Sequence, residues 1–168
     1  MKYLLSIIVL LNSISSYADS FVKYGIGIGY SGKDSYAETK LLGLGYNSEL
    51  LGDIKALSFI KYQQELGFWV DNKTNDKRKS SAYGNTSLGI DIKGGFLTAS
   101  SFHGVGLVSN PDIYLGSYYQ FFHDISGGLT DDKSKASITL TYKHISNAGL
   151  KQPNIGRDFL LFKLSIPW

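Results

Sequence analysis

Hydrophobic and polar residues alternate with a period of two over most of the chain after Asp19. Successive side chains of a β-strand point to opposite faces, so this alternation is typical of strands with one apolar face. The pattern therefore predicts an all-β protein. The apolar faces comprise Tyr24, Ile26, Ile28 and Tyr30; Leu42, Leu44 and Tyr46; Leu88, Ile90 and Ile92; Ile138, Leu140 and Tyr142; and Leu160, Phe162, Leu164, Ile166 and Trp168.

Turn-forming residues divide the chain into eight expected strands. Clusters of Gly, Asn, Asp and Pro interrupt the alternation, and such clusters favour the tight turns that join antiparallel strands. We expect strands at about 21–30, 38–48, 54–70, 82–92, 96–108, 114–129, 136–146 and 158–168.

The two faces of these strands differ in a way that favours a membrane barrel. The regular face is apolar and aromatic, whereas the other face is small or polar and carries Lys61, Asp91, Lys143 and Lys163. An eight-stranded barrel has room inside for side chains only, and its apolar face would contact lipid. The chain also ends in an alternating strand at the aromatic Trp168, an ending that resembles the C-terminal signal of bacterial outer-membrane barrels.

We therefore expect an eight-stranded antiparallel up-and-down transmembrane β-barrel. A soluble periplasmic β-sandwich that binds a ligand is the structural alternative, because its strands would also alternate.

Composition removes several function classes. The chain of 168 residues has no Cys, which excludes a disulfide scaffold, a thiolate metal site and a Cys nucleophile. A net charge of +3 is too small to indicate nucleic acid as the main partner.

The N-terminal segment has the features of a secretory signal peptide. Lys2 precedes the apolar run 4–11, and Ser16 and Ala18 are small residues at the positions that a signal peptidase reads. The run is too short for a spanning helix. We expect cleavage after Ala18, a signal peptide at 1–18 and an outer-membrane barrel domain at 19–168.

One hairpin carries residues with the chemistry of a serine hydrolase. His144 and Ser146 are two residues apart on an expected strand, so they share the face of Leu140. Asp158 shares the face of Leu160 on the next strand. The connection between the strands is a hairpin, so the strand ends should be neighbours. The sequence thus predicts an imidazole, a hydroxyl and a carboxylate on the lipid-facing side near one rim, where a Ser-His-Asp set would satisfy all three groups.

Each member of this set has a role that fits its chemistry. Serine needs an adjacent base, which His144 would supply, and Asp158 would hold the ring in the right tautomer. Asn147, Asn154 and the Ala148-Gly149 backbone would present N–H donors to an oxyanion. On spacing alone, a His-x-Ser pair is more often a rim pair beside a turn, and the matching face of Asp158 is what strengthens the catalytic interpretation.

The other two histidines offer no comparable set in the sequence. His123 and Asp124 are adjacent, so on a strand they face opposite ways and cannot pair directly. His103 has no evident partner. We expect both to have structural roles in the barrel wall or its interior.

The run from His144 to Asn154, followed by Gly156, resembles the C-terminal signature of the bacterial outer-membrane lipid A 3-O-deacylases of the PagL type. This resemblance implies an eight-stranded barrel with a serine hydrolase site on its outer wall and lipid A (lipopolysaccharide) as the substrate, cut at a 3-O-linked hydroxyacyl ester. Ser146 matches the nucleophile of the family and His144 its base, while Asn147 and Asn154 match asparagines near the oxyanion site. The resemblance implies no metal or organic cofactor and, besides the substrate, contact with outer-membrane lipid; it leaves monomer and homodimer open.

The chain departs from the family pattern at two positions. The acid of the family is typically Glu, whereas Asp158 is shorter by one methylene, so a direct bond to His144 requires a closer approach of the strands. Arg157 adds a charge, which we interpret as a solvated side chain, with contact to a lipid A phosphate as the alternative. For Lys151, headgroup contact and loop packing are equally open. A non-catalytic barrel used for adhesion or envelope integrity is the competing function.

Overall fold

The computed structural model describes residues 18–28, 39–51, 54, 57–71, 79–112 and 114–167. The expected signal peptide falls almost entirely outside this range. Trp168 also falls outside it, as do most residues between the first and second expected strands and between the third and fourth. Among the described residues there is no helix that is long and apolar enough to cross a membrane.

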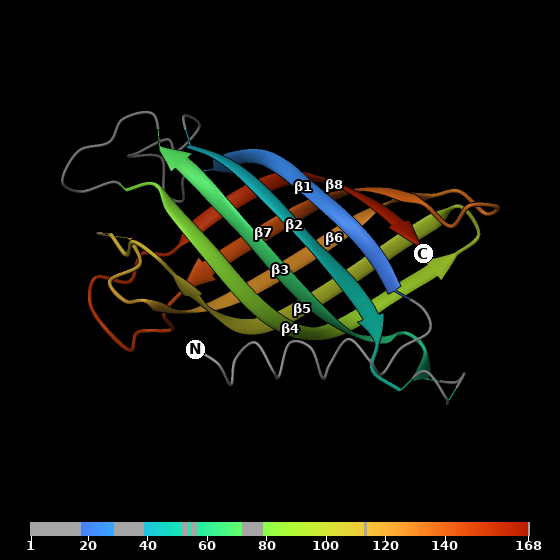
Figure 1. Cartoon of the computed structure of the whole chain (residues 1–168), viewed down its shortest axis with the longest axis horizontal. Helices are drawn as coiled ribbons and strands as arrows, with labels where there is room; N and C mark the ends of the chain where they lie inside the picture. The colour runs from blue at the N-terminus through green and yellow to red at the C-terminus, as the bar shows by residue number, and fades with distance from the viewer. Residues whose placement is uncertain are drawn as a thin grey trace.

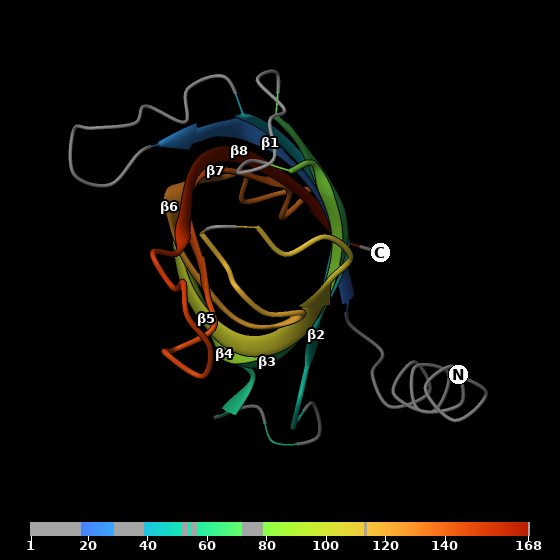
Figure 2. The same cartoon turned by 90° about the vertical axis from the view of Figure 1, so that its left-hand side faces the viewer.

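Eight antiparallel strands form one closed barrel in chain order (Figures 1 and 2). The strands are β1 (Ala18–Ile28), β2 (Thr39–Glu49), β3 (Ile60–Asp71), β4 (Ser81–Gly94), β5 (Leu97–Val108), β6 (Tyr119–Thr130), β7 (Ser137–Ser146) and β8 (Arg157–Pro167). Pairing of β1 with β8, from Asp19↔Pro167 to Ile28↔Asp158, closes the cylinder. Closure pairs every strand on both sides, so the fold has no open sheet edge.

The predicted fold class is confirmed and the β-sandwich alternative is wrong. The apolar faces point outward, as the alternation predicted: Leu66 is 72 % exposed and Phe162 is 68 % exposed. Lys143, Lys163 and Asp91 are buried and point into the lumen, as predicted for the polar face. Apolar side chains outside and charged side chains inside are the arrangement of a barrel whose solvent is lipid.

Two expected strand starts are wrong. β3 begins at Ile60 rather than near residue 54, and β6 begins at Tyr119 rather than near residue 114. Tyr114 and Leu115 are apolar enough to look like strand residues, but they are buried inside the barrel mouth. Figure 2 shows the β5–β6 connection lying within the ring of strands.

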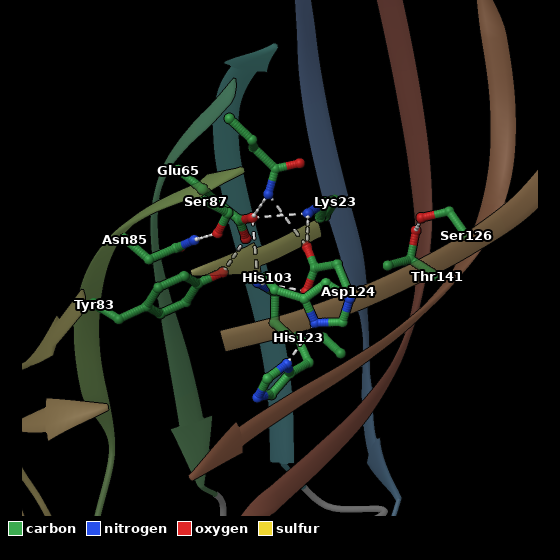
Figure 3. A network of polar contacts seen from close by, with 12 residues as sticks. Lys23, Glu65, Tyr83, Asn85, Ser87, His103, His123, Asp124, Ser126 and Thr141 are labelled. Atoms are coloured by element: carbon green, nitrogen blue, oxygen red, sulfur yellow. Dashed lines mark hydrogen bonds and ion pairs between the residues drawn. The ribbon is translucent and has the colours of Figure 1, made fainter. Parts of the chain in front are cut away.

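The centre of the lumen holds a network of buried charges (Figure 3). Lys23 Nζ contacts Glu65 Oε2 at 2.7 Å and also Asp124, while Lys143 Nζ lies 3.2 Å from Glu65 and 3.0 Å from Asp124. Tyr83 donates to the other Glu65 oxygen. Each carboxylate is therefore shared by two ammonium groups, which offsets the desolvation cost of burying four charges.

A second buried ion cluster occupies the mouth of the barrel and corrects both interpretations of Arg157. Arg157 is the first residue of β8 and is 1 % exposed, so it is neither solvated nor available to a lipid phosphate. Its guanidinium binds Asp71 and Asp112 and lies over the rings of Trp69 and Tyr114. The reason is alternation: Arg157 shares the inward face of β8.

Candidate active site

The site begins with the pairing of the last two strands. In the β7–β8 hairpin His144 lies directly opposite Asp158, and both side chains point outward. Residues opposite each other on one face of an antiparallel pair have adjacent side chains. Their proximity therefore follows from the register that the hairpin imposes.

A short hydrogen bond joins the two groups. His144 Nδ1 lies 2.6 Å from Asp158 Oδ1, so the shorter Asp reaches the ring directly. A carboxylate can only accept, so Nδ1 carries the hydrogen and Nε2 is left as the basic nitrogen of the neutral ring. This is the tautomer that a general base facing a serine requires.

Tyr142 is a further member of the site that the sequence analysis missed. Its hydroxyl donates to the same Asp158 Oδ1 over 2.6 Å. Tyr142 lies on the outer face of β7, two residues before His144, so its face was predictable. Its bond to Asp158 was not, because it depends on side-chain reach across the strand pair.

Ser146 is the last residue of β7 and lies on the same outer face as His144, two residues away. Within the described part of the chain, no hydrogen bond links Ser146 to the His144 ring. Such bonds are often long or poorly aligned without substrate and tighten in the complex. The structure thus brings His144 and Asp158 into contact and places Ser146 beside them without a bond.

The loop after Ser146 is ordered by Asn147, whose side chain is fully buried. Its amide NH₂ donates to the carbonyls of Leu115 and Lys151, each over 2.6 Å, and its Oδ1 accepts from Gly149 N–H at 3.0 Å. The side chain of Asn147 and the N–H of Gly149 are therefore engaged inside the loop rather than directed at a substrate.

Asn154 differs from Asn147 in the hydrogen bonds that its side-chain amide makes. Asn154 Oδ1 accepts the backbone N–H of Asn147 over 2.9 Å, which fixes the orientation of the side chain. In the region that the structure describes, the Asn154 NH₂ is bonded to no acceptor, and the residue is partly exposed. Of the three predicted oxyanion residues, Asn154 alone has side-chain N–H groups that remain available.

Gly156 keeps the loop close to the His144 ring. Its φ of 82° lies in the left-handed region, and a Cβ built on it would come within 2.7 Å of His144 Cε1. The Gly156 and Ile155 N–H groups both donate to the Tyr114 carbonyl, at 2.9 and 3.0 Å. Glycine therefore allows the loop to contact both the mouth segment and the His144 ring.

A row of imidazoles continues from His144 along the outer wall. His103, His123 and His144 lie opposite one another on β5, β6 and β7. His103 Nδ1 lies 2.7 Å from His123 Nδ1, and His103 Nε2 lies 3.0 Å from Ser101 Oγ; Figure 3 shows the first of these contacts. The His123 and His144 ring centroids are 6.1 Å apart.

This row corrects the view that His103 has no partner. Polar groups that face lipid are costly unless they bond to one another. His103 and His123 meet that requirement by bonding to each other, and His144 meets it through Asp158. The face of each histidine was predictable from alternation, but the contact required the β5–β6 register. No group of three or more His, Cys, Asp or Glu side chains among the described residues has an arrangement that holds a metal.

Comparison with known proteins identifies the family. Residues 59–167 match the family model described as lipid A 3-O-deacylase (PagL). No curated protein matches at a significant level. The crystal structure of the outer membrane enzyme PagL superimposes with a TM-score of 0.65 at 20 % identity, covering 89 % of this chain and 99 % of that one, which supports the same fold. Since the family match spans more than half of the sequence, the chain belongs to the PagL family of lipid A 3-O-deacylases and is an ester hydrolase.

Proposed function

We propose that this protein removes the 3-O-linked hydroxyacyl chain of lipid A with a Ser146-His144-Asp158 triad on the lipid-facing wall. The observation that carries the proposal is the 2.6 Å bond between His144 and Asp158 on the outer face, with Ser146 on the same face. Membership of the lipid A 3-O-deacylase family supports the substrate.

In the first half of the reaction the ester carbonyl lies against Ser146. Ser146 Oγ attacks the carbonyl carbon while His144 Nε2 takes the hydroxyl proton. Asp158 accepts from Nδ1 and stabilises the imidazolium that forms. The tetrahedral intermediate collapses when the imidazolium returns its proton to the leaving sugar oxygen, which leaves the acyl group on Ser146.

The oxyanion of the tetrahedral intermediate is assigned to the Asn154 amide. Its NH₂ is available, and its orientation is fixed by the bond from Asn147 N–H to Oδ1. Asn147 and Gly149 act as positioning residues, because their polar groups hold the loop that carries Asn154. A donor held in place before the reaction costs no reorganisation when charge develops.

In the second half, water attacks the acyl-Ser146 ester with His144 again as the base, and the fatty acid is released. His144 lies near the β7–β8 loop, at the end of the barrel, where water can enter. The reaction as proposed uses side chains of this protein and water.

Mass spectrometry of lipid A from a Gram-negative host tests this function. Cells that express the protein should lose one hydroxyacyl chain from lipid A, and cells that express Ser146→Ala or His144→Asn should retain it. An unchanged lipid A profile with a folded wild-type barrel in the membrane would contradict the proposal.

We propose that residues 1–18 direct export and are removed as a signal peptide. Ala18 is also the first residue of β1, so cleavage after it shortens that strand by one residue and leaves the Asp19↔Pro167 pair in place. The intact mass of the protein purified from outer membranes gives the N-terminus; a start at any residue other than Asp19 would refute this cleavage site.

A further inference from the structure

The outer wall has an apolar groove on β2 to β5, apart from the strands β7 and β8 that carry the triad. The groove has a volume of about 440 Å³, within the range of about 300–1,000 Å³ that is usual for ligand pockets. Its walls include Leu44, Leu66, Val105 and Leu107, which are between 47 and 72 % exposed. Gly84 lies between them and leaves the floor open: a Cβ there would approach only Leu66, at 3.0 Å.

Strand register gives the groove a direction. One line of directly opposed residues runs Leu107, Gly84, Leu66 and Leu44 from β5 to β2. Leu107 is the penultimate residue of β5 at the barrel end that carries the β7–β8 loop, whereas Leu44 is in the middle of β2. The groove therefore descends obliquely from the level of the candidate site toward the middle of the wall, as an alkyl chain would from a headgroup at the rim.

A second line of opposed residues connects the groove to the triad. Tyr46, Gln64, Thr86 and Val105 form its lower side, and the same line continues through Phe121 on β6 to Ser146 on β7. Three strand spacings separate Thr86 from Ser146, or roughly 14 Å at about 4.8 Å each. Alkyl chains in van der Waals contact lie about 4 Å apart. The distance between Thr86 and Ser146 is therefore the width of a few alkyl chains that lie side by side.

The lining indicates what the groove takes. It is mainly apolar, and the polar side chains at one end bond to each other, with Tyr46 O–H donating to Gln64 Oε1 at 2.9 Å. A groove of this kind offers a chain van der Waals contact, and the carboxylate of Glu65, a residue that also lines it, points into the lumen. We propose that the groove seats a second, non-scissile acyl chain of the same multiply acylated lipid whose ester lies at Ser146. This inference rests on the proposed function, and it makes the number of chains on the substrate a determinant of specificity.

The test fills the groove and compares two substrates in detergent micelles. Gly84→Phe places a ring over the groove floor, and Leu66→Trp narrows the groove from its wall in case the first variant folds poorly. Gly127→Phe is the matched control, since Gly127 is an exposed outer-wall glycine on β6 with open space around it. The substrates are hexa-acylated lipid A and a glucosamine that carries only the scissile 3-O-acyl chain.

We expect Gly84→Phe and Leu66→Trp to lower kcat/KM on hexa-acylated lipid A at least 10-fold, mainly through KM, and to change it less than 2-fold on the monoacyl substrate. Gly127→Phe should leave both values within 2-fold. Equal losses on the two substrates would overturn the proposal by assigning the groove to the scissile chain. No loss on either would overturn it too, leaving the groove to bulk lipid.

Binding separates this inference from the proposed function. Ser146→Ala in micelles should retain hexa-acylated lipid A in native mass spectrometry, and the double variant Ser146→Ala/Gly84→Phe should bind it at least 10-fold more weakly. Absence of hydrolysis by every variant would refute the proposed function alone. Equal lipid A binding by the single and double variants would refute the second-chain seat, whatever the activity.

Discussion

The lumen network and the outer-wall row are built from adjacent residues of the same strands but have opposite character. Asp124 and Lys143 point inward to the buried ion pairs, and their sequence neighbours His123 and His144 point outward to the row. Inside, the four charges of the network are fully enclosed, and each one is matched by an opposite charge. Outside, the groups are imidazoles, a hydroxyl and one carboxylate, and they bond in two sets, Ser101–His103–His123 and His144–Asp158. The inner set is arranged to hold strands together, and the outer set leaves basic nitrogens and hydroxyls accessible.

This difference predicts that substitutions on the outer face change activity and substitutions on the inner face change stability, and the largest effect is expected at the proposed nucleophile. Ser146→Ala should lower deacylation at least about 10³-fold, because the acyl-enzyme cannot form. Stability should stay within about 0.5 kcal/mol, since the hydroxyl makes no hydrogen bond in the described structure. Turnover of lipid A and urea unfolding in micelles measure the two quantities.

Ser101→Ala is the matched control on the same wall. Ser101 already bonds to a histidine but lies outside the proposed triad, so turnover should change less than about 3-fold. A larger loss in Ser101→Ala than in Ser146→Ala would mean that Ser101, and not Ser146, is the nucleophile.

A substitution on the inner face should give the next largest effect, which is a loss of free energy of unfolding. Asp124→Ala removes a carboxylate bonded to Lys23 and Lys143 and leaves two buried ammonium groups with one partner fewer. We expect a loss of about 3–5 kcal/mol in the free energy of unfolding. Asp132→Ala, which breaks an exposed pair with Lys135 at 3.7 Å, should cost less than about 1 kcal/mol. Similar losses in the two variants would show that the lumen pairs contribute no more than surface pairs.

Asp158 should matter for rate rather than for folding. Asp158→Asn keeps the shape but can bond the ring through its NH₂ and select the other tautomer, so turnover should fall about 10²-fold or more. Asp158→Glu should retain activity, because glutamate is the acid that the resemblance to the PagL family implies at this position. Steady-state kinetics on purified lipid A decide; full activity in Asp158→Asn would mean that another acid orients His144.

The smallest effect concerns Tyr142. Tyr142→Phe removes one donor to Asp158 Oδ1, and a hydrogen bond to a charged group contributes about 1.5–3 kcal/mol. The ring bond of His144 remains, so we expect a loss in kcat near 10-fold with little change in KM. In an Asp158→Glu background the same substitution should cost less, because the longer side chain moves the carboxylate away from the position that the Tyr142 hydroxyl contacts in this structure. An equal loss in both backgrounds would argue against a positioning role.

The period of two was sufficient to predict the barrel and the face of nearly every strand residue, including His144, Ser146 and Asp158. The same period could not predict which residues pair across two strands where a loop, such as the one before β6, is as apolar as a strand. Starting β6 near residue 114 pairs His103 with a residue close to Tyr119, whereas the observed start places it opposite His123. Arg157 was misinterpreted for a related reason: extending β8 by one residue moves it from the loop to the lumen.

The roles of the asparagines were beyond the sequence because their bonds join segments distant in the chain. Asn147 is held by the carbonyl of Leu115, and that contact exists only because the β5–β6 connection folds into the barrel mouth. Chemistry and spacing indicated which residues gather near the rim, but packing decides which of them keeps a free N–H.

The filled interior of the barrel has a consequence for how substrate and product move. In the described part of the barrel, the lumen is occupied at its centre by Lys23, Lys143, Glu65 and Asp124 and is crossed at its mouth by Arg157. At the site proposed on the outer wall, lipid would therefore arrive by lateral diffusion within its own leaflet and the severed chain would depart the same way, so the rate of supply would depend on the fluidity of the surrounding membrane.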